Sequence, residues 1–186
     1  MAELDIALMG NEILKRVADP VEDPRAPEIA TLARDMQDTL EIITSSGIAA
    51  PQVFVSKRVI VYRIAERLIP PGSKMKPIPW RVLVNPVLEP LSDEKEPIGY
   101  EKCLSLPGLH GEVPRYTRVR IQAQQLDGSS IEITAAGYHA RLLQHEYDHL
   151  DGILYPQRMT DITKLAFNSE LVDPITIPRD PALFVE

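Results

Sequence analysis

A hairpin followed at once by a helix constrains the fold of this chain more than any other stretch. Residues 118–126 and 131–135 alternate apolar and polar side chains, as half-buried strands do, and they flank the turn-forming pair Asp127-Gly128. Residues 137–150 then read as a helix, with Gly152 just past its end, where glycine is favoured. Strands and helices in this order predict an α+β fold with a mostly antiparallel sheet.

A second helix is predicted from apolar periodicity in the first third of the chain. Apolar residues between positions 28 and 44 recur at spacings of three and four, the pattern of an amphipathic helix. Pro27 suits the first turn of this helix, and Ser45-Ser46-Gly47 suits its end. Seventeen prolines in 186 residues favour extended and turning connections over a helical bundle.

Strands and loops account for most of the rest. β-Branched residues predict strands at 58–64 and 81–91, and Pro86 indicates an edge position or a break in the second. Residues 100–108 read as extended. The four prolines of 66–79 indicate a surface loop, and 93–97 a charged turn.

Composition and charge narrow the class of protein. The chain is 44% hydrophobic and 25% charged, which is typical of a globular protein, and its length predicts one domain over 1–186 with a peripheral tail from about 161. The net charge of −7, without a cluster of Lys and Arg, argues against direct nucleic-acid binding. No apolar run has membrane-spanning length and no signal peptide is evident, so a cytoplasmic protein is expected.

The helix over 137–150 carries the pattern that bears most on function. His145 and His149 are four residues apart, so both imidazoles face the same side of a helix and can bind one metal ion. Glu146 then lies close enough to accept a proton from a water molecule at that metal. The alternative is an amphipathic helix that exposes these side chains to solvent.

A catalytic metal site needs a third protein ligand. The only cysteine, Cys103, is the candidate, and it lies where a strand is expected to end. The alternative is that this thiol is a small buried hydrophobic group, as lone cysteines in cytosolic proteins commonly are.

Three separate stretches resemble the three motifs of peptide deformylases. They are Gly47-Ile48-Ala49-Ala50-Pro51-Gln52, Glu101-Lys102-Cys103-Leu104-Ser105 and His145-Glu146-Tyr147-Asp148-His149-Leu150. The resemblance extends over roughly residues 6 to 160 and keeps the order and spacing of the motifs. Two positions depart from the family pattern: Ser45 stands where the first motif usually begins with glycine, and Lys102 replaces the usual glycine of the second.

The resemblance implies an α+β fold built around the metal-binding helix, and a ferrous ion held by Cys103, His145 and His149. Zn²⁺, Ni²⁺ and Co²⁺ are possible replacements. Glu146 would move the proton, and the side-chain amide of Gln52 and the backbone N–H of Leu104 would stabilise the oxyanion.

Substrate contacts follow from the same resemblance and from helical spacing. An extended peptide is expected to pair with the backbone at Gly47 and Ile48 and to pass Lys102, whose long side chain would narrow or charge the rim of the cleft. The apolar pocket for the methionine side chain is assigned to three residues that precede the metal histidines. These are Tyr138, Arg141 (through the stem of its side chain) and Leu142.

Several neighbouring polar residues have two interpretations each. Glu101 and Arg115 form either an ion pair that orients the ligand strand or a solvated pair. Asp148 either supports the site or faces water. His110 and His139 are taken as ordinary polar residues.

The predicted function is a metal-dependent hydrolase that removes the N-formyl group from the starting methionine of new polypeptides and releases formate. Its partners would be nascent formyl-Met chains, with transient ribosome association. Two alternatives remain: an amidase of the same fold with altered specificity, motivated by Ser45 and Lys102, and a non-catalytic binding module stabilised by metal. A zinc endopeptidase fits less well, because such enzymes usually take their third ligand from a downstream His or Glu.

Overall fold

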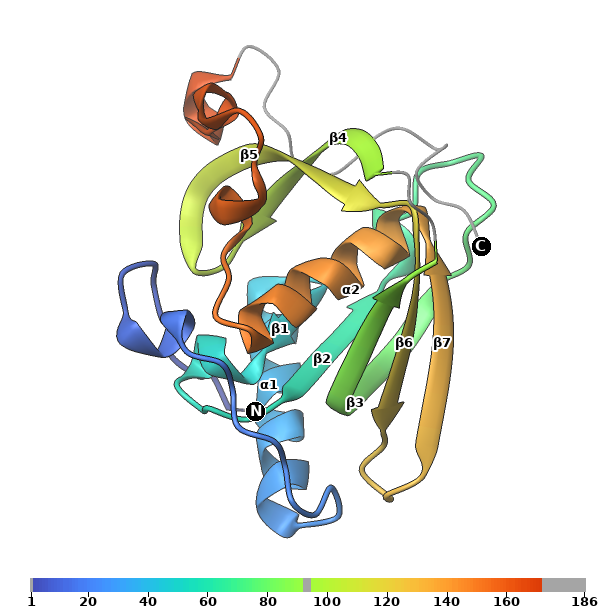
Figure 1. Ribbon diagram of the computed structural model, residues 1–186. Coiled ribbons are helices and arrows are strands. Elements are labelled where there is room, and N and C mark those ends of the chain that lie inside the picture. The colour runs from blue at the N-terminus through green and yellow to red at the C-terminus, as the bar shows by residue number, and fades with distance from the viewer. Residues whose placement is uncertain (1, 92–94, 172–186) are drawn as a thin grey trace.

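A five-stranded antiparallel sheet forms the body of the protein (Figure 1). The computed structural model describes residues 2–91 and 95–171. Within them the strand order of the sheet is β1-β2-β3-β6-β7. The strands are β1 (Gly47–Ala49), β2 (Val59–Ile64), β3 (Ile78–Pro90), β6 (Arg118–Gln124) and β7 (Ser130–Ala136), and each pairs with its neighbour in antiparallel register. The α+β fold with antiparallel pairing is confirmed.

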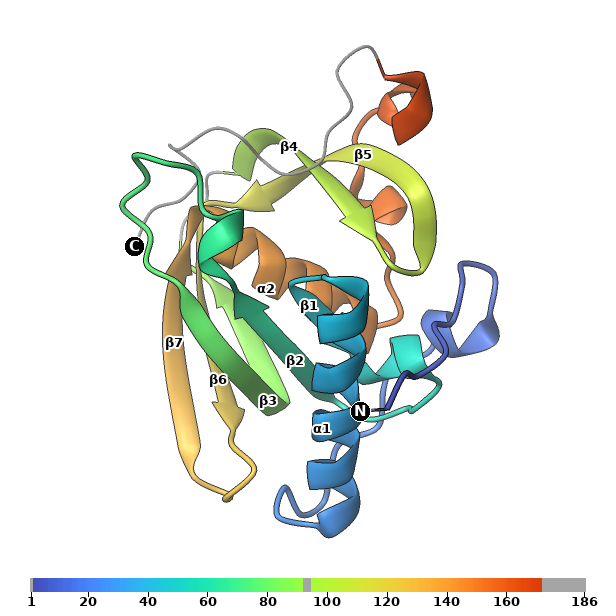
Figure 2. The same ribbon diagram turned by 180° about the vertical axis from the view of Figure 1, so that it is seen from behind.

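Two helices cover opposite faces of this sheet, as the two views in Figures 1 and 2 show. Helix α1 (Pro27–Ile43) packs on one face and α2 (Gly137–Leu150) on the other. Strand β2 explains how both faces become apolar: Val59 and Val61 point to the α1 side, and Ile60 and Tyr62 to the α2 side. Both helices therefore lie where the sequence predicts them.

A smaller sheet closes over α2 from the other side (Figure 1). It consists of β4 (Lys95–Cys103), β5 (Leu106–Tyr116) and the short β8 (Ala166–Phe167). The turn between β4 and β5 is Leu104-Ser105, so the stretch 100–108 is extended only on either side of a tight reversal. Cys103 ends β4, as the sequence indicates, and this reversal holds it beside α2.

Short 3-10 helices join these elements. They are Glu12–Lys15, Ala50–Val53, Glu66–Leu68, Tyr155–Arg158, Ile162–Lys164 and Asn168–Glu170. Residues 155–171 run along β5, so the first part of the predicted tail packs against the body of the protein. Of the charged turn predicted at 93–97, residues 93 and 94 lie outside the described residues, and 95–97 already belong to β4.

Strand β3 corrects one prediction and confirms its alternative. Pro86 does not mark an edge, because β3 lies in the middle of the sheet between β2 and β6. It marks a break: the register shifts between Val84 and Val87, and Asn85 has a φ of 51°. The Asn85 side chain makes use of the bulge, since it exchanges two hydrogen bonds of 2.8 Å with the backbone of Val21.

His139 is buried between α2 and the sheet, where its Nε2 lies 3.1 Å from the hydroxyl of Tyr62. Burial, reinforced by the positive charge of Arg81, lowers the pKa of His139 to about 4. His139 therefore takes up a proton near pH 6.5 in the unfolded chain but only near pH 4 in the folded protein. Its contribution to folding stability is complete above pH 6.5 and is lost as the pH falls toward 4.

We expect the wild type to lose stability relative to the His139→Gln variant as the pH is lowered. Between pH 7 and pH 4 the unfolding free energy of the wild type should fall by roughly 3 kcal/mol relative to the variant. Urea unfolding of both proteins at several pH values measures the difference. A difference that does not change with pH would show that His139 titrates normally in the folded protein.

Candidate active site

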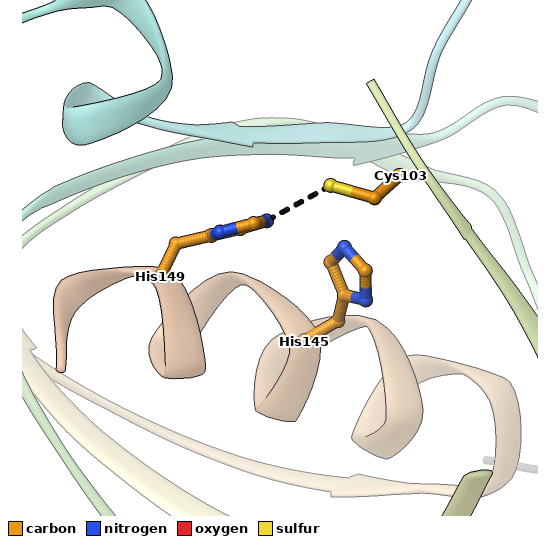
Figure 3. Close-up of side chains that lie close together, drawn as sticks. All are labelled: Cys103, His145 and His149. Atoms are coloured by element: carbon orange, nitrogen blue, oxygen red, sulfur yellow. Dashed lines mark hydrogen bonds between the residues drawn. The ribbon is translucent and has the colours of Figure 1, made fainter. Parts of the chain in front are cut away.

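The three predicted metal ligands converge on one point (Figure 3). His145 and His149 rise from the same face of α2, and Cys103 approaches from the end of β4. One ligand atom of each residue lies within 4.8 Å of those of the other two, and the sulfur of Cys103 is 3.3 Å from Nε2 of His149. All three side chains are nearly inaccessible to solvent. The helix therefore does not expose its two histidines to solvent, as the alternative interpretation required.

A hydrogen bond of His145 determines which of its two ring nitrogens is available to bind a metal. Its Nδ1 donates to a carboxylate oxygen of Glu101 at 2.8 Å, which leaves Nε2 for a metal. Glu101 comes from β4, two residues before Cys103, so one strand supplies both a ligand and the group that orients another ligand.

The Glu101–Arg115 pair is buried, so the solvated alternative is wrong. Arg115 donates from Nε and Nη2 to the two oxygens of Glu101 at 2.8 and 2.9 Å. Its Nη1 donates to Asp148 at 2.6 Å, and both carboxylates are less than a tenth exposed. Asp148 therefore does not face water either. Arg141 adds a further donor to Glu101 at 3.1 Å and one to the carbonyl of Val113 at 2.7 Å.

Electrostatics hold the Cys103 thiol in the thiolate form that binds metal. Burial alone raises the pKa of Cys103, but the charges and hydrogen bonds of His149 and His145 outweigh it and hold this pKa well below its ordinary value. Burial likewise opposes the charge on Glu101, yet Arg115 keeps the pKa of that carboxyl low. A thiolate and two oriented imidazoles form the donor set that suits zinc or iron, so the residues present fit such an ion.

Glu146 lies in the same cleft but, unlike Glu101, is not paired with an arginine among the described residues. Its side chain is buried, and within the described part of the chain its Oε2 has no hydrogen-bond partner. Burial raises the pKa of Glu146 to about 7, although the neighbouring imidazoles lower it. A carboxylate held in this way is suited to accept and return a proton near neutral pH.

The cleft beside the metal ligands brings together most of the predicted substrate residues. Its lining comes from β1, β4, α2, the end of α1, two 3-10 helices and the β4–β5 turn. The residues are Thr44, Ser45, Ser46, Gly47, Gln52, Leu68, Tyr100, Glu101, Lys102, Cys103, Leu104, Tyr138, Arg141, Leu142, His145 and Glu146. Ile48 is absent from this lining, because its side chain is fully buried in the core under α1.

Gln52 is buried, and hydrogen bonds orient both ends of its amide. Its carbonyl oxygen accepts from the backbone N–H of Ala49 at 2.9 Å, and its Nε2 lies 3.4 Å from the sulfur of Cys103 and 3.2 Å from Ser105 Oγ. The amide hydrogens therefore point at the metal end of the cleft. Leu104 lies in the β4–β5 turn directly after Cys103 and lines the same cleft.

Gly47 owes its identity to the proximity of Glu146. A Cβ at position 47 would lie 2.6 Å from Glu146 Oε1, closer than real Cβ contacts occur. We expect Gly47→Ala to displace the carboxylate and lower kcat/KM by about 10²-fold, since a shift of about an ångström in a catalytic group has that effect. Metal content and melting temperature should change little. Full activity in this variant would show that Glu146 can move without consequence.

Some residues of the site were not predicted. Tyr155 stacks against His145 with ring centroids 6.2 Å apart, and Arg158 pairs with Asp148 at 2.7 Å. Both follow α2 in a stretch of weak periodicity, so no spacing pattern marks them. Leu68, in the loop predicted at 66–79, also reaches the cleft wall. The exposed Lys102 lines the rim, as the long side chain suggested.

Comparison with known proteins decides the family. A family model described as polypeptide deformylase matches residues 3–165. The chain belongs to the polypeptide deformylase family. Peptide deformylase 2 of Ralstonia nicotianae is 45% identical over 95% of this chain and 96% of its own length. Peptide deformylase 1 of Nitrosomonas europaea is 42% identical over 92% and 96%.

Solved structures agree with this membership. A class I type b peptide deformylase from Acinetobacter baumannii, crystallised with Met-Ala-Ser bound, is 38% identical with a TM-score of 0.75, and the match covers 85% of this chain and all of that one. Deformylase membership confirms the prediction of a hydrolase that removes the N-formyl group from the starting methionine. The binding-module alternative gains no support. Within the described residues no helix is long and apolar enough to cross a membrane.

Proposed function

We propose that Cys103, His145 and His149 hold one ferrous ion, and that Glu146 transfers the proton in hydrolysis of the formyl amide. The observation that carries this assignment is the convergence of three ligand atoms within 4.8 Å beside a buried carboxylate whose Oε2 has no partner among the described residues. When bound, the metal polarises the formyl carbonyl and lowers the pKa of water.

The chain's own residues supply the remaining steps. Glu146 accepts a proton as water adds to the formyl carbon, and returns it to the amine nitrogen as the C–N bond breaks. The amide of Gln52 and the backbone N–H of Leu104 donate to the oxygen that gains negative charge. Formate and a peptide with a free amino terminus are the products.

Strand β1 positions the substrate in this proposal. It is an edge strand of the large sheet, and the carbonyl of Ser46, just before β1, accepts from the backbone N–H of Arg63 in β2. Because antiparallel strands alternate, the N–H and C=O of Gly47 face the other way, toward the cleft. An extended peptide can pair there. Ile48 then contributes by packing β1 onto the core rather than by contact with the peptide.

The methionine side chain enters the cleft between Tyr138, Arg141 and Leu142. The guanidinium of Arg141 is held by Glu101 and Val113, so its stem is left to line the pocket. The Tyr138 hydroxyl donates to Ser46 Oγ at 3.4 Å, which joins the helix wall of the cleft to the β1 wall. The substrates are nascent formyl-Met polypeptides. The protein binds them in the cytoplasm while it is transiently associated with the ribosome.

Formate release tests the proposal. Protein purified anaerobically and reconstituted with Fe²⁺ should release formate from formyl-Met-Ala-Ser. It should release no acetate from acetyl-Met-Ala-Ser, because the acetyl methyl group crowds the carbon that water must attack. Zn²⁺, Ni²⁺ and Co²⁺ forms are compared in the same assay. No formate from a protein that binds one ion per chain would contradict the proposal and favour the altered-specificity amidase.

A further inference from the structure

The segment that follows α2 contacts two of the proposed metal ligands through residues outside the lining of the substrate cleft. The ring of Tyr155 stacks on His145 with an angle of 25° between the planes. Leu154 and Tyr155 also pack with Cys103 in a small apolar cluster beneath the β4–β5 hairpin. Two of the three proposed ligands are therefore backed by residues 154–155, and the same short helix ends at Arg158.

A continuous series of ion pairs connects Arg158 to a metal ligand. Arg158 donates from Nη2 and Nε to the two oxygens of Asp148 at 2.7 and 3.1 Å. Asp148 accepts from Arg115 at 2.6 Å, and Arg115 holds Glu101 at 2.8 and 2.9 Å. Glu101 then accepts from Nδ1 of His145 at 2.8 Å. Every link between Arg158 and the ligand is a charge-assisted hydrogen bond, and those beyond Arg158 are buried.

We propose that Arg158 is a positioning residue that slows loss of the metal, an inference that rests on the metal site of the proposed function. Asp148 shares its charge between Arg115 and Arg158. Without Arg158, the buried carboxylate depends on Arg115 alone and draws that guanidinium away from Glu101. Glu101 then holds the His145 ring less firmly. Loss of a partner that orients a metal ligand weakens metal binding by about 10- to 100-fold. Arg158 acts on such a partner, Glu101, only through Asp148 and Arg115, so its effect should be smaller.

Arg58 provides a matched control. It pairs with Asp151 at 2.8 Å, also at the C-terminal end of α2, but among the described residues it contacts neither Asp148 nor a proposed ligand. Arg158→Gln and Arg58→Gln each remove an arginine–aspartate pair from the same end of one helix. Only the first interrupts the path to His145. The Arg158 side chain is 45% exposed, so its replacement should leave the fold intact.

The experiment measures the rate at which Co²⁺-loaded protein transfers its metal to a chelator, followed by the cobalt absorption. We expect Arg158→Gln to lose metal about three- to tenfold faster than the wild type, and Arg58→Gln to lose it at the wild-type rate. Arg158→Lys, which keeps the charge but not the two-pronged contact, should fall between wild type and Arg158→Gln.

A double variant tests whether the path runs through Asp148. Adding Arg158→Gln to Asp148→Asn should produce no further acceleration, because Asp148 is the only acidic partner of Arg158 among the described residues. Equal rates in Arg158→Gln and wild type, or an equal acceleration in Arg58→Gln, would overturn the inference while leaving the metal site intact. A wild type that binds no metal would instead refute the proposed function.

Discussion

Glu146→Gln is expected to lower kcat/KM for a formylated peptide by about 10²- to 10⁴-fold, the range over which general acid–base groups contribute. The change keeps the size and shape of the side chain but removes its ability to accept a proton. Glu146 is not one of the three clustered ligand residues, so the variant should still bind one metal ion per chain. Steady-state formate release and metal content are measured on the same preparation.

Glu146→Asp separates chemistry from structure in that experiment. Aspartate retains the carboxylate but withdraws it by one carbon, so it should restore part of the activity that glutamine removes. A glutamine variant as active as the wild type, with its metal in place, would show that another group transfers the proton. A glutamine variant that has lost its metal would make Glu146 a structural residue.

Arg115→Met should reduce the unfolding free energy by about 3–5 kcal/mol, the usual effect of removing one partner from a buried ion pair. Arg115 bridges Glu101 and Asp148, and all three side chains are buried. Methionine keeps an unbranched apolar stem in the space of the arginine stem but leaves two carboxylates with fewer donors. Urea unfolding of metal-free protein measures the loss without the contribution of bound metal.

Arg120→Met is the matched control, because Arg120 pairs with Glu89 on the exposed surface of the large sheet. Its loss should change stability by no more than about 1 kcal/mol. Replacing Glu101 by Gln together with Arg115→Met should recover part of the lost stability, since the uncompensated charge is then removed. An Arg115 variant no less stable than the Arg120 variant would show that the network contributes nothing to folding.

Local patterns in the sequence predict most of the secondary structure and the three residues proposed as metal ligands. The helices at 27–43 and 137–150 are local patterns: apolar spacing, a proline at the start of one and a glycine after the other are read within a few residues. The hairpin about Asp127-Gly128 is equally local. His145, His149 and Glu146 need only the geometry of one helix, and Cys103 is the single cysteine of the sequence. The role of Gln52 came from the resemblance to a family.

Which polar groups are buried, and which groups they contact, depends on how distant segments of the chain come together. Glu101, Arg115 and Asp148 have the composition of a solvated surface, yet the β4–β5 hairpin closes over α2 and joins them in one network. Pro86 is tolerated in a central strand because the bulge at Asn85 interrupts the pairing with β6 at that point. Arg158 carries no signal in the chain. Burial and ion pairing depend on segments far apart in sequence, so they follow from how the two sheets enclose the helix rather than from local pattern.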